Sequence, residues 1–562
     1  MKKKKSLARY LELNLGNSSA GRFPHDRFRP GTELETLRII KRAAADKKIR
    51  GVFLNTSGFS ANREYLWELR NALEGCKRSG KKIAAYFDMA DLDLYCLMSV
   101  ADKIIMDSAG VLNFLGYSWG RLFVKETLDK LGIGFRELRY LDYKSATDTF
   151  ARTTISDADR EQYGAYLDDI FNLTKTAVIK NRAMGEEKFD ALLKEGFILS
   201  PGEAKSRALV DAVGREDSIK ETIKGMEFAD SKEGEITFIS AGNPAFGFFN
   251  HGGKISRYTA RRARGLCLPE IAVIHARGAT DLDRGMEARK ISRLIRKLGE
   301  KPRVKALVVR IDSPGGSAVS ADFIAGAIQD VKKKIPVVVS FGQVAASGGY
   351  WAAMYASHIT ASPYTLTGSI GVIGSWFFNK GMNAKLGLNF EALTRGEHAD
   401  LATGIILPQR DLSGEEEERF RRCLLDLYGE FVKKAALGRN MKEEELEALA
   451  RGRVYSGIAS QRSRLTDSLG GYLEALETAR NLAGIAPSKK VKIREYPRPK
   501  FLEKMAAKAF SSAIPEGQAP VSLLQNPRMT GLWDDLYYRF SKNGQIMPIL
   551  PCFLLTEFNQ RS

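Results

Sequence analysis

The sequence contains few of the residues that build metal sites or disulfide frameworks. Its five cysteines are widely dispersed and form no CxxC pair: Cys76, Cys96, Cys267, Cys423 and Cys552. The five histidines show no HExxH or other ligand spacing. We therefore expect no disulfide framework, no zinc or other metal site, and no cofactor.

Long uncharged apolar runs are also missing. None reaches the 18 or so residues that a membrane-spanning helix needs. The first residues, MKKKKSLARYLELNLG, are interrupted by Arg9, Glu12 and Asn14 and do not fit a signal peptide. The apolar tail at 546–555 (IMPILPCFLL) is short and broken by prolines. We therefore predict that no segment of this sequence crosses a membrane.

Positive charge is what the sequence has in excess. Lysine and arginine number 87 against 67 aspartates and glutamates, for a net charge of +20. The charge is densest at Lys2–Lys5 and Arg257–Arg264. Zinc-finger spacing, RNA-binding aromatic signatures and a basic zipper are all absent. We therefore expect no nucleic-acid partner and favour an anionic membrane surface.

The chain carries an internal repeat with an offset of about 256 residues. Gly196–Gly214 (GFILSPGEAKSRALVDAVG) matches Gly452–Gly470 (GRVYSGIASQRSRLTDSLG), and earlier apolar strands match at nearly the same offset. In both halves, short β-branched strands alternate with amphipathic helices, which predicts βαβ units and mainly parallel sheets. We therefore expect an N-terminal segment (1–44), a first repeat domain (45–230), a linker (231–267), a second repeat domain (268–486) and a C-terminal extension (487–562).

Two neighbouring motifs of the second half favour a catalytic site. A strand runs into AASGGYW (345–351), which places Ser347 at or beside a helix N-terminus, where unpaired N–H groups favour negative charge. The turn DSPGG (312–316) ends another strand and would point further N–H groups into the same crevice. Serine is also a preferred N-cap residue, and a proline–glycine turn needs no function. The local patterns therefore leave structural and catalytic roles open.

These two blocks, followed by TLTGSIGVIG (365–374), resemble in order and spacing the catalytic domain of the signal peptide peptidase A (protease IV) family. The resemblance extends over nearly the whole chain and includes the duplication. It implies an α/β fold of two tandem Clp protease/crotonase-like domains with a C-terminal extension. It also implies a Ser-Lys dyad, with Ser347 as nucleophile and Lys144, in a Tyr-Lys-Ser motif, as general base. Ser369 would hydrogen-bond the lysine, and Gly316 and Gly348 would supply oxyanion N–H groups.

The repeat supports this assignment. Superposing the halves sets Leu92 opposite Ser347, and Glu397-His398-Ala399 opposite the Tyr-Lys-Ser motif. Each half would then supply one member of the dyad, and we expect the site at an interface between the two domains. A free lysine has a pKa of about 10.4 and is charged at neutral pH, so burial must lower the pKa of Lys144 before it can accept a proton.

Two other functions stay open. A crotonase-like acyl-CoA enzyme would share the fold type and the oxyanion hole but would need neither Ser347 nor Lys144. A non-catalytic oligomeric scaffold would need no site at all. A Ser-His-Asp triad built on His275, His358 or His398 is disfavoured, because no GxSxG elbow surrounds Ser347 or Ser369.

The resemblance further implies a serine endopeptidase that degrades signal peptide remnants or other short hydrophobic peptides. It implies a homo-oligomer, a tetramer in this family. Family members usually carry an N-terminal membrane anchor, which we do not find in this sequence, so either the protein starts upstream of the first residue given or it is peripheral. We therefore expect peripheral membrane association, and a cytoplasmic location if the chain starts where the sequence does.

Overall fold

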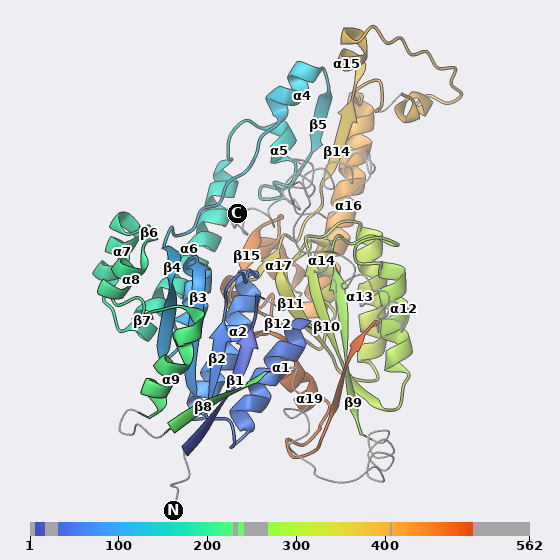
Figure 1. Cartoon of the computed structure of the whole chain (residues 1–562). Helices are drawn as coiled ribbons and strands as arrows, with labels where there is room; N and C mark the ends of the chain where they lie inside the picture. The colour runs from blue at the N-terminus through green and yellow to red at the C-terminus, as the bar shows by residue number, and fades with distance from the viewer. Residues whose placement is uncertain (1–5, 17–31, 229–233, 241–267, 405–406, 498–562) are drawn as a thin grey trace, which may run out of the picture. The chain divides into compact units, whose positions relative to one another are not determined.

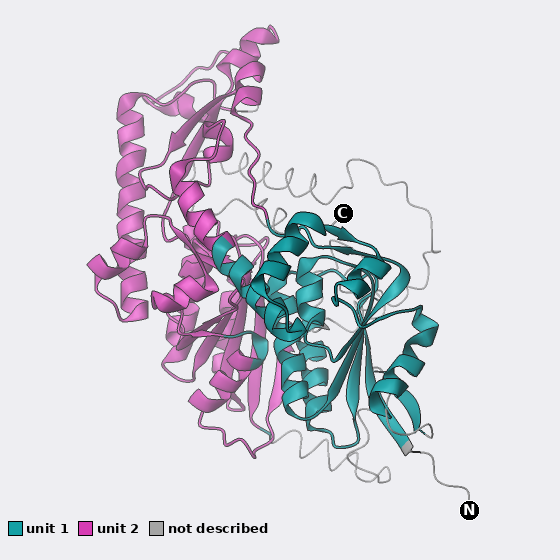
Figure 2. Ribbon diagram, turned by 90° about the vertical axis from the view of Figure 1, so that its left-hand side faces the viewer, with its two compact units in different colours: residues 1–117, 168–268, 470–473 teal, residues 118–167, 269–469, 474–562 magenta. Residues whose placement is uncertain are grey.

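The structure is a computed structural model that describes residues 6–16, 32–228, 234–240, 268–404 and 407–497. The predicted basic clusters, most of the predicted linker, Cys267, Cys552 and nearly all of the C-terminal extension lie outside these residues. The chain divides into two compact units (Figure 2). Unit 1 comprises residues 1–117, 168–268 and 470–473, and unit 2 comprises residues 118–167, 269–469 and 474–562.

Unit 1 is built on a seven-stranded sheet in the order β6-β4-β3-β2-β1-β8, with β7 also beside β4 (Figure 1). All its strand pairs are parallel except β4 with β6. The strands are β1 (Ser6–Asn14), β2 (Gly51–Asn55), β3 (Lys82–Ala90), β4 (Lys103–Asn113), β6 (Ile198–Leu199), β7 (Ala212–Val213) and β8 (Gly234–Ser240). The helices are α1 (Thr32–Ala45), α2 (Arg63–Arg78), α3 (Leu92–Met98), α7 (Glu186–Glu195), α8 (Pro201–Ser206), η2 (Glu216–Ser218) and α9 (Ile219–Glu227).

Unit 2 contains an eight-stranded sheet in the order β15-β13-β11-β10-β9-β17, with β12 beside β11 and β16, and a two-stranded ribbon of β14 and β5 (Figure 1). Its strands are β5 (Gly134–Leu138), β9 (Glu270–Arg277), β10 (Val304–Ser313), β11 (Val337–Ala346), β12 (His358–Ala361), β13 (Leu366–Gly368), β14 (Gly374–Phe378), β15 (Val454–Ser456), β16 (Ser468–Leu469) and β17 (Lys492–Tyr496).

The helices of unit 2 are α4 (Lys125–Leu131), α5 (Asp148–Ala151), α12 (Ala288–Gly299), α13 (Ala318–Lys332), α14 (Gly348–Ala353), α15 (Lys380–Lys385), η3 (Ala399–Ala402), α16 (Gly414–Arg439), α17 (Glu443–Leu449) and α18 (Gly457–Arg462). Two more helices have residues in both units: α6 (Asp157–Arg182) and α19 (Tyr472–Leu482).

Buried parallel strands explain why the site can form in unit 2. Apart from Lys305, which is exposed, and Asp312, which is partly exposed, the residues of β10 are buried, as expected for a parallel strand covered on both faces. β10 pairs in parallel with β11, from Leu307 beside Val337 to Ser313 beside Ala345. The carboxyl ends of both strands therefore lie at one edge of the sheet, so the DSPGG turn and the AASGG turn meet there.

The prediction of a duplicated α/β fold with mainly parallel sheets is confirmed. The strand order β4-β3-β2-β1-β8 of unit 1 recurs as β12-β11-β10-β9-β17 in unit 2. The compact units do not follow the repeat boundaries, however, because residues 118–167 of the first repeat are counted with unit 2. Their strand β5 pairs antiparallel with β14 of the second repeat, from Gly134 beside Phe378 to Leu138 beside Gly374.

Candidate active site

Ser347 lies between β11 and α14 in an unusual backbone conformation. Its φ is +56° and its ψ is −116°, a region that costs a non-glycine residue about 1–3 kcal/mol. The N–H of Ser347 donates to the carbonyl of Gly368 (2.8 Å), and its own carbonyl accepts from the N–H of Trp351 (2.9 Å). These bonds hold the serine at the end of the strand despite the unfavourable backbone angles.

Lys144 reaches both Ser347 and Ser369. Its Nζ lies 2.6 Å from Oγ of Ser347, 2.9 Å from Oγ of Ser369 and 2.9 Å from the carbonyl oxygen of Ser369. All three residues belong to unit 2, so both members of the predicted dyad lie within one compact unit. The expectation of a site shared by two domains therefore has to be restated. Each repeat supplies one residue, but residues 118–167, which contain Lys144 and are called the lysine segment below, belong to the same compact unit as the second repeat.

Lys144, Ser347 and Ser369 are all buried, and this burial shifts the pKa of the lysine. Lys144 is 1% exposed, and Ser347 and Ser369 are equally buried. Desolvation lowers the pKa of Lys144 well below its usual value, because the charged ammonium loses its water. An uncharged amine carries two N–H groups and one lone pair. In its uncharged form, the amine would donate its two N–H groups to the two oxygen atoms of Ser369 and direct its lone pair at the hydroxyl of Ser347.

Arg121 holds the backbone beside Lys144. Its Nη1 donates to the carbonyl of Ser145 (2.5 Å), and its Nη2 lies 2.9 Å from the carboxylate of Asp159. Both side chains of this ion pair are fully buried. Burial raises the pKa of Asp159, and Arg121 opposes that shift. The pair is therefore a buried structural anchor for the lysine segment.

Gln162 links the lysine segment to the strand beside Ser369. Its Nε2 donates to the carbonyl of Tyr143 (3.1 Å), and its Oε1 accepts from the N–H of Val454 (3.0 Å). Val454 begins β15, which pairs with β13 immediately before Ser369. Sequence reasoning missed Arg121 and Gln162, because neither lies in a motif and their partners are far away in the sequence.

The two predicted oxyanion glycines lie next to one another. A Cβ placed on Gly348 would be 3.2 Å from the backbone nitrogen of Gly316. An isolated β-bridge joins Thr280 to Gly316, and it uses the carbonyl of Gly315 and the N–H of Ser317. The bridge therefore does not use the N–H of Gly316. The two turns bring two glycine backbones together at the strand end that carries Ser347.

The three histidines considered for a triad have other partners. His275 bonds Glu495 (2.9 Å), His358 bonds Ser468 (2.8 Å) and His398 bonds Glu416 (2.8 Å). In the part of the chain that the structure describes, no three His, Cys, Asp or Glu side chains form a group that could hold a metal ion.

The first repeat has no serine at the equivalent position. α3 begins at Leu92, and the residue before it is Asp91, whose side chain accepts from the N–H of Leu94. By its place before the helix, Asp91 rather than Leu92 is the counterpart of Ser347. The sequence superposition was therefore displaced by one residue at this point.

The protein is an α/β protein in which a buried lysine amine lies beside a buried serine hydroxyl, and comparison with known proteins gives its family. The model of peptidase family S49 matches residues 76–227 and 329–486, more than half of the chain. The chain therefore belongs to peptidase family S49, in its duplicated form, and is a serine-type peptidase. The predicted family and enzyme class are confirmed.

Curated relatives match over most of the chain. Serine protease SPPA, chloroplastic, of Arabidopsis thaliana is 30% identical over 489 residues, which are 84% of this chain and 69% of that protein. Protease 4 of Haemophilus influenzae is 29% identical over 460 residues, which are 79% of this chain and 72% of that protein.

Solved structures match over shorter stretches. The 1510-N membrane-bound stomatin-specific protease, as a lysine-to-alanine mutant in complex with a substrate peptide, matches with a TM-score of 0.28 and 15% identity, covering 44% of this chain and 99% of that one. A mutant of ClpP1 from Listeria monocytogenes matches with a TM-score of 0.25 and 13% identity, covering 36% of this chain and 94% of that one.

Proposed function

We propose that the chain is an endopeptidase in which Ser347 is the nucleophile and Lys144 is its general base. The observation that carries the proposal is the 2.6 Å separation of Nζ and Oγ between two fully buried side chains. Burial lowers the pKa of the amine and so favours its uncharged form, and an uncharged amine within hydrogen-bond reach of a hydroxyl meets the geometric requirement for a base.

The reaction follows from these contacts. Oγ of Ser347 attacks the peptide carbonyl while Nζ of Lys144 takes its proton. The N–H groups of Gly316 and Gly348 stabilise the oxyanion that forms on the former carbonyl oxygen. Lys144 then gives the proton to the leaving amine as the C–N bond breaks, which leaves an ester on Ser347. A water molecule, deprotonated by Lys144, hydrolyses this ester, and the serine recovers its proton. Ser369 holds the amine in place throughout.

The proposed substrates are signal peptide remnants or other short hydrophobic peptides, as the family resemblance implies. The proposed assembly is a homo-oligomer, with a tetramer as the expectation from the same resemblance. Neither assignment depends on a cofactor.

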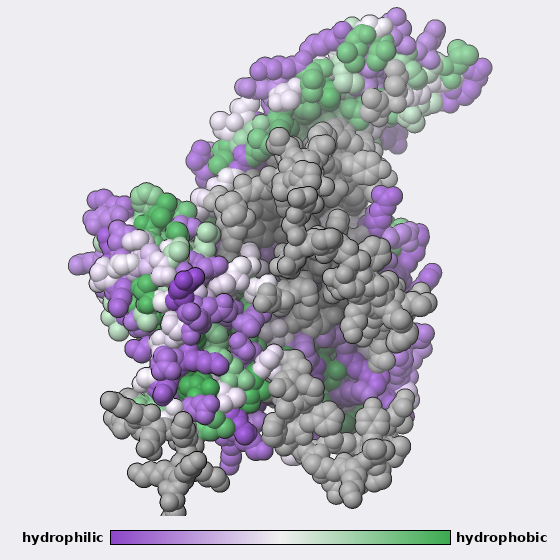
Figure 3. Space-filling model, in the orientation of Figure 1, coloured by the Kyte–Doolittle hydropathy of each residue, from purple (hydrophilic) through white to green (hydrophobic). Residues whose placement is uncertain are grey.

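Peripheral membrane association is part of this proposal. Within the described ranges, no helix has both the length and the apolar character that crossing a bilayer requires. Leu386, Leu388, Phe390 and Leu393 are exposed in the segment after α15, and Figure 3 shows hydrophobic residues on the surface around that helix. Lys380 and Lys385 are exposed beside them. Apolar side chains next to lysines suit an anionic bilayer surface. Flotation with anionic vesicles tests the association, and complete recovery in the vesicle-free fraction at low salt would contradict it.

A fluorophosphonate probe tests the catalytic assignment. The wild type should be labelled, Ser347→Ala should not, and Lys144→Met should be labelled at least 100-fold more slowly because the base is missing. Ser206→Ala, in α8 of unit 1, is the matched control and should be labelled like the wild type. Labelling that survives Ser347→Ala would show that another residue is the nucleophile.

The same variants separate the alternatives. Cleavage of a hydrophobic reporter peptide should be lost with Ser347→Ala and with Lys144→Met. A crotonase-like acyl-CoA enzyme would keep its activity in both variants, and a non-catalytic scaffold would neither be labelled nor cleave the peptide.

A further inference from the structure

A third strand end reaches the site formed by the DSPGG and AASGG turns. In the sheet of unit 2, β10 lies between β9 and β11, and both of its neighbours run parallel to it. Residues 278–281 directly follow β9, which ends at Arg277. Because parallel strands end at the same edge of the sheet, these residues lie beside the DSPGG turn. They approach it from the side opposite the AASGG turn.

The backbone of Thr280 is paired with the DSPGG turn. Its N–H donates to the carbonyl of Gly315 (2.7 Å), and its carbonyl accepts from the N–H of Ser317 (2.7 Å). These two bonds form a parallel bridge between Thr280 and Gly316. Successive N–H groups of a paired strand point to opposite sides. Since the N–H of Ser317 points to Thr280, the N–H of Gly316 points the other way, to the side of β11.

The corresponding turn of the first repeat closes on itself. Both turns receive the same hydrogen bond from the end of the preceding strand, at the carbonyl of Asn55 (2.9 Å) or of Asp312 (2.9 Å), which places Phe59 opposite Gly316. The N–H of Phe59 donates to the carbonyl of Thr56 (2.9 Å) within its own turn. In the second repeat, the bridge holds the residues on both sides of Gly316, so it opposes the same closure.

The side chain of Thr280 contacts both predicted oxyanion glycines. Thr280 is fully buried. A Cβ on Gly316 would lie 2.8 Å from its Oγ1, and a Cβ on Gly348 would lie 2.7 Å from the same atom. The hydroxyl donates to the carbonyl of Ser317 (3.3 Å), which fixes its direction. Oγ1 therefore fills the space that side chains at positions 316 and 348 would take, and the spacing of the two glycine backbones depends on it.

We propose that Thr280 is a positioning residue for the oxyanion hole. It directs the N–H of Gly316 toward the side of β11 and holds Gly316 and Gly348 at the spacing that the oxyanion requires. The inference rests on the proposed function, in which Ser347 attacks a peptide carbonyl and these two N–H groups receive the charge. Such donors are effective because they are in place before the charge develops. Thr280 acts through the two glycines and takes no proton in the reaction.

Substitution of Thr280 separates its effect on catalysis from an effect on peptide binding. With a hydrophobic reporter peptide, Thr280→Ala should lower kcat by about 10- to 100-fold, because the two donors remain but are displaced. KM should stay at the wild-type value. Thr280→Ser keeps Oγ and should recover most of the lost kcat. Thr280→Val keeps the shape of the side chain but not its hydrogen bond, and should not recover it.

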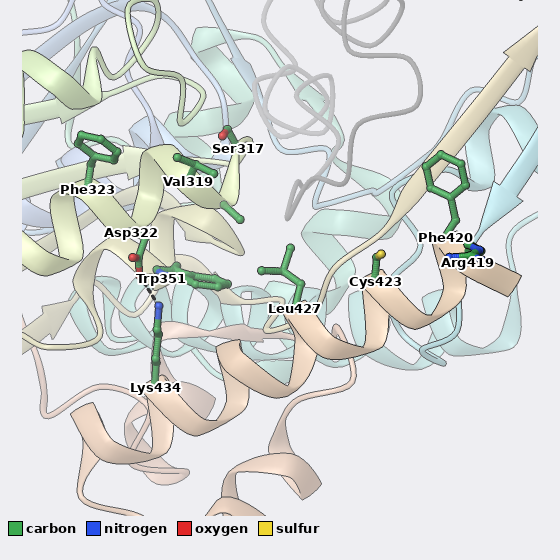
Figure 4. Close-up of a pocket in the computed structure, with 11 residues that line it drawn as sticks. Ser317, Val319, Asp322, Phe323, Trp351, Arg419, Phe420, Cys423, Leu427 and Lys434 are labelled. Atoms are coloured by element: carbon green, nitrogen blue, oxygen red, sulfur yellow. Dashed lines mark hydrogen bonds and ion pairs between the residues drawn. The ribbon is translucent and has the colours of Figure 1, made fainter. Parts of the chain in front are cut away.

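A neighbouring cavity supplies the competing explanation. Ser317, whose backbone is held by Thr280, lies on the wall of a cavity of about 720 Å³ (Figure 4). The same wall includes Val319, Phe323 and Trp351. If Thr280 only supported this wall, its variants would bind a hydrophobic peptide less well, so KM would rise while kcat stayed the same. That result would overturn the proposal.

Thr360→Ala is the matched control. Thr360, in β12, is also fully buried, and its hydroxyl donates to the carbonyl of Val339 at the same distance of 3.3 Å. Both alanine variants should lose a similar amount of thermal stability, but Thr360→Ala should keep the wild-type kcat. Because the amine of Lys144 is bonded to two serines, the midpoint of the pH–rate profile should be the same in Thr280→Ala and in the wild type.

The outcomes distinguish this inference from the proposed function. If the wild type neither reacts with a fluorophosphonate at Ser347 nor cleaves the peptide, the proposed function and this inference both fail. If the wild type is active and Thr280→Ala keeps its kcat, only the role of Thr280 is wrong. Should Thr280→Ala not fold, the other two variants decide: equal kcat in Thr280→Ser and Thr280→Val would overturn the proposal.

Discussion

Gly452 lies directly against the backbone of Lys144. A Cβ on Gly452 would be 2.6 Å from both the Cβ and the backbone nitrogen of Lys144. Around it, the N–H of Tyr143 donates to the carbonyl of Arg451 (3.1 Å), and the N–H of Gly452 donates to the carbonyl of Ile370 (2.8 Å). The loop that contains Gly452 therefore contacts both the lysine segment and the segment that follows Ser369.

Gly452→Ala should lower kcat/KM by about 100-fold, because the added methyl group displaces Lys144 from its position beside Ser347. The matched control is Gly387→Ala. Gly452 and Gly387 both have positive φ, +85° and +67°, but a Cβ on Gly387 meets no atom within 4 Å. Both variants bear the backbone strain, so only Gly452→Ala should lose activity in a peptide-cleavage assay. Equal activity in the two variants would show that this contact does not position the base.

The activity should rise with pH. The reactive form of Lys144 is the uncharged amine, and kcat/KM reports the ionisation of the free enzyme. Because burial lowers the pKa of Lys144, the rise should be complete well below the value of about 10.4 that is usual for lysine. A pH–rate profile on a neutral reporter peptide measures this. A midpoint at the usual lysine value would mean that the base is not desolvated.

Lys144→Met should make the protein more stable at neutral pH while it abolishes activity. The folded pKa of Lys144 lies below its unfolded value, so the unfolded chain binds more protons between the two and wild-type stability rises with pH across that window. Burying Lys144 at pH 7 therefore costs free energy, because its ammonium must be desolvated or lose its proton. Methionine has no charge and avoids this cost, so we expect a gain on the order of 1 kcal/mol in the free energy of unfolding at pH 7.

The gain from Lys144→Met should shrink as the pH approaches 10, where the unfolded lysine also loses its proton. Urea unfolding of both proteins at a series of pH values gives the comparison. A methionine variant that is less stable than the wild type at every pH would contradict the prediction.

Ser347→Gly and Ser347→Ala should both be inactive, but the glycine variant should be more stable by about 1 kcal/mol. The backbone of Ser347 lies in the mirror image of the β region, which glycine adopts freely and alanine does not. Thermal unfolding of the two variants under identical conditions measures the difference. If the alanine variant is the more stable of the two, the strain at Ser347 is not relieved by removing its Cβ.

Much of the site could be predicted from the sequence because its motifs are local. The strand–turn–helix pattern around Ser347 is contiguous, and the DSPGG turn ends the neighbouring strand, so parallel pairing alone brings the two turns together. Lys144 was found only through a family resemblance and the repeat, since a lysine in a loop gives no sign of its own burial. Arg121 and Gln162 left no signal, because their partners lie in other segments.

The duplication, the alternation of strands and helices, and the position of the serine can all be derived from the sequence without a structure. These follow from periodicity and from residue order, which do not depend on distant neighbours. Three features depend instead on the folded chain: residues 118–167 pack with the second repeat, Lys144 is removed from water, and α13 exposes Val319 and Phe323 while α2 buries two glutamates. Burial is set by atoms from remote parts of the chain, so no local pattern contains it.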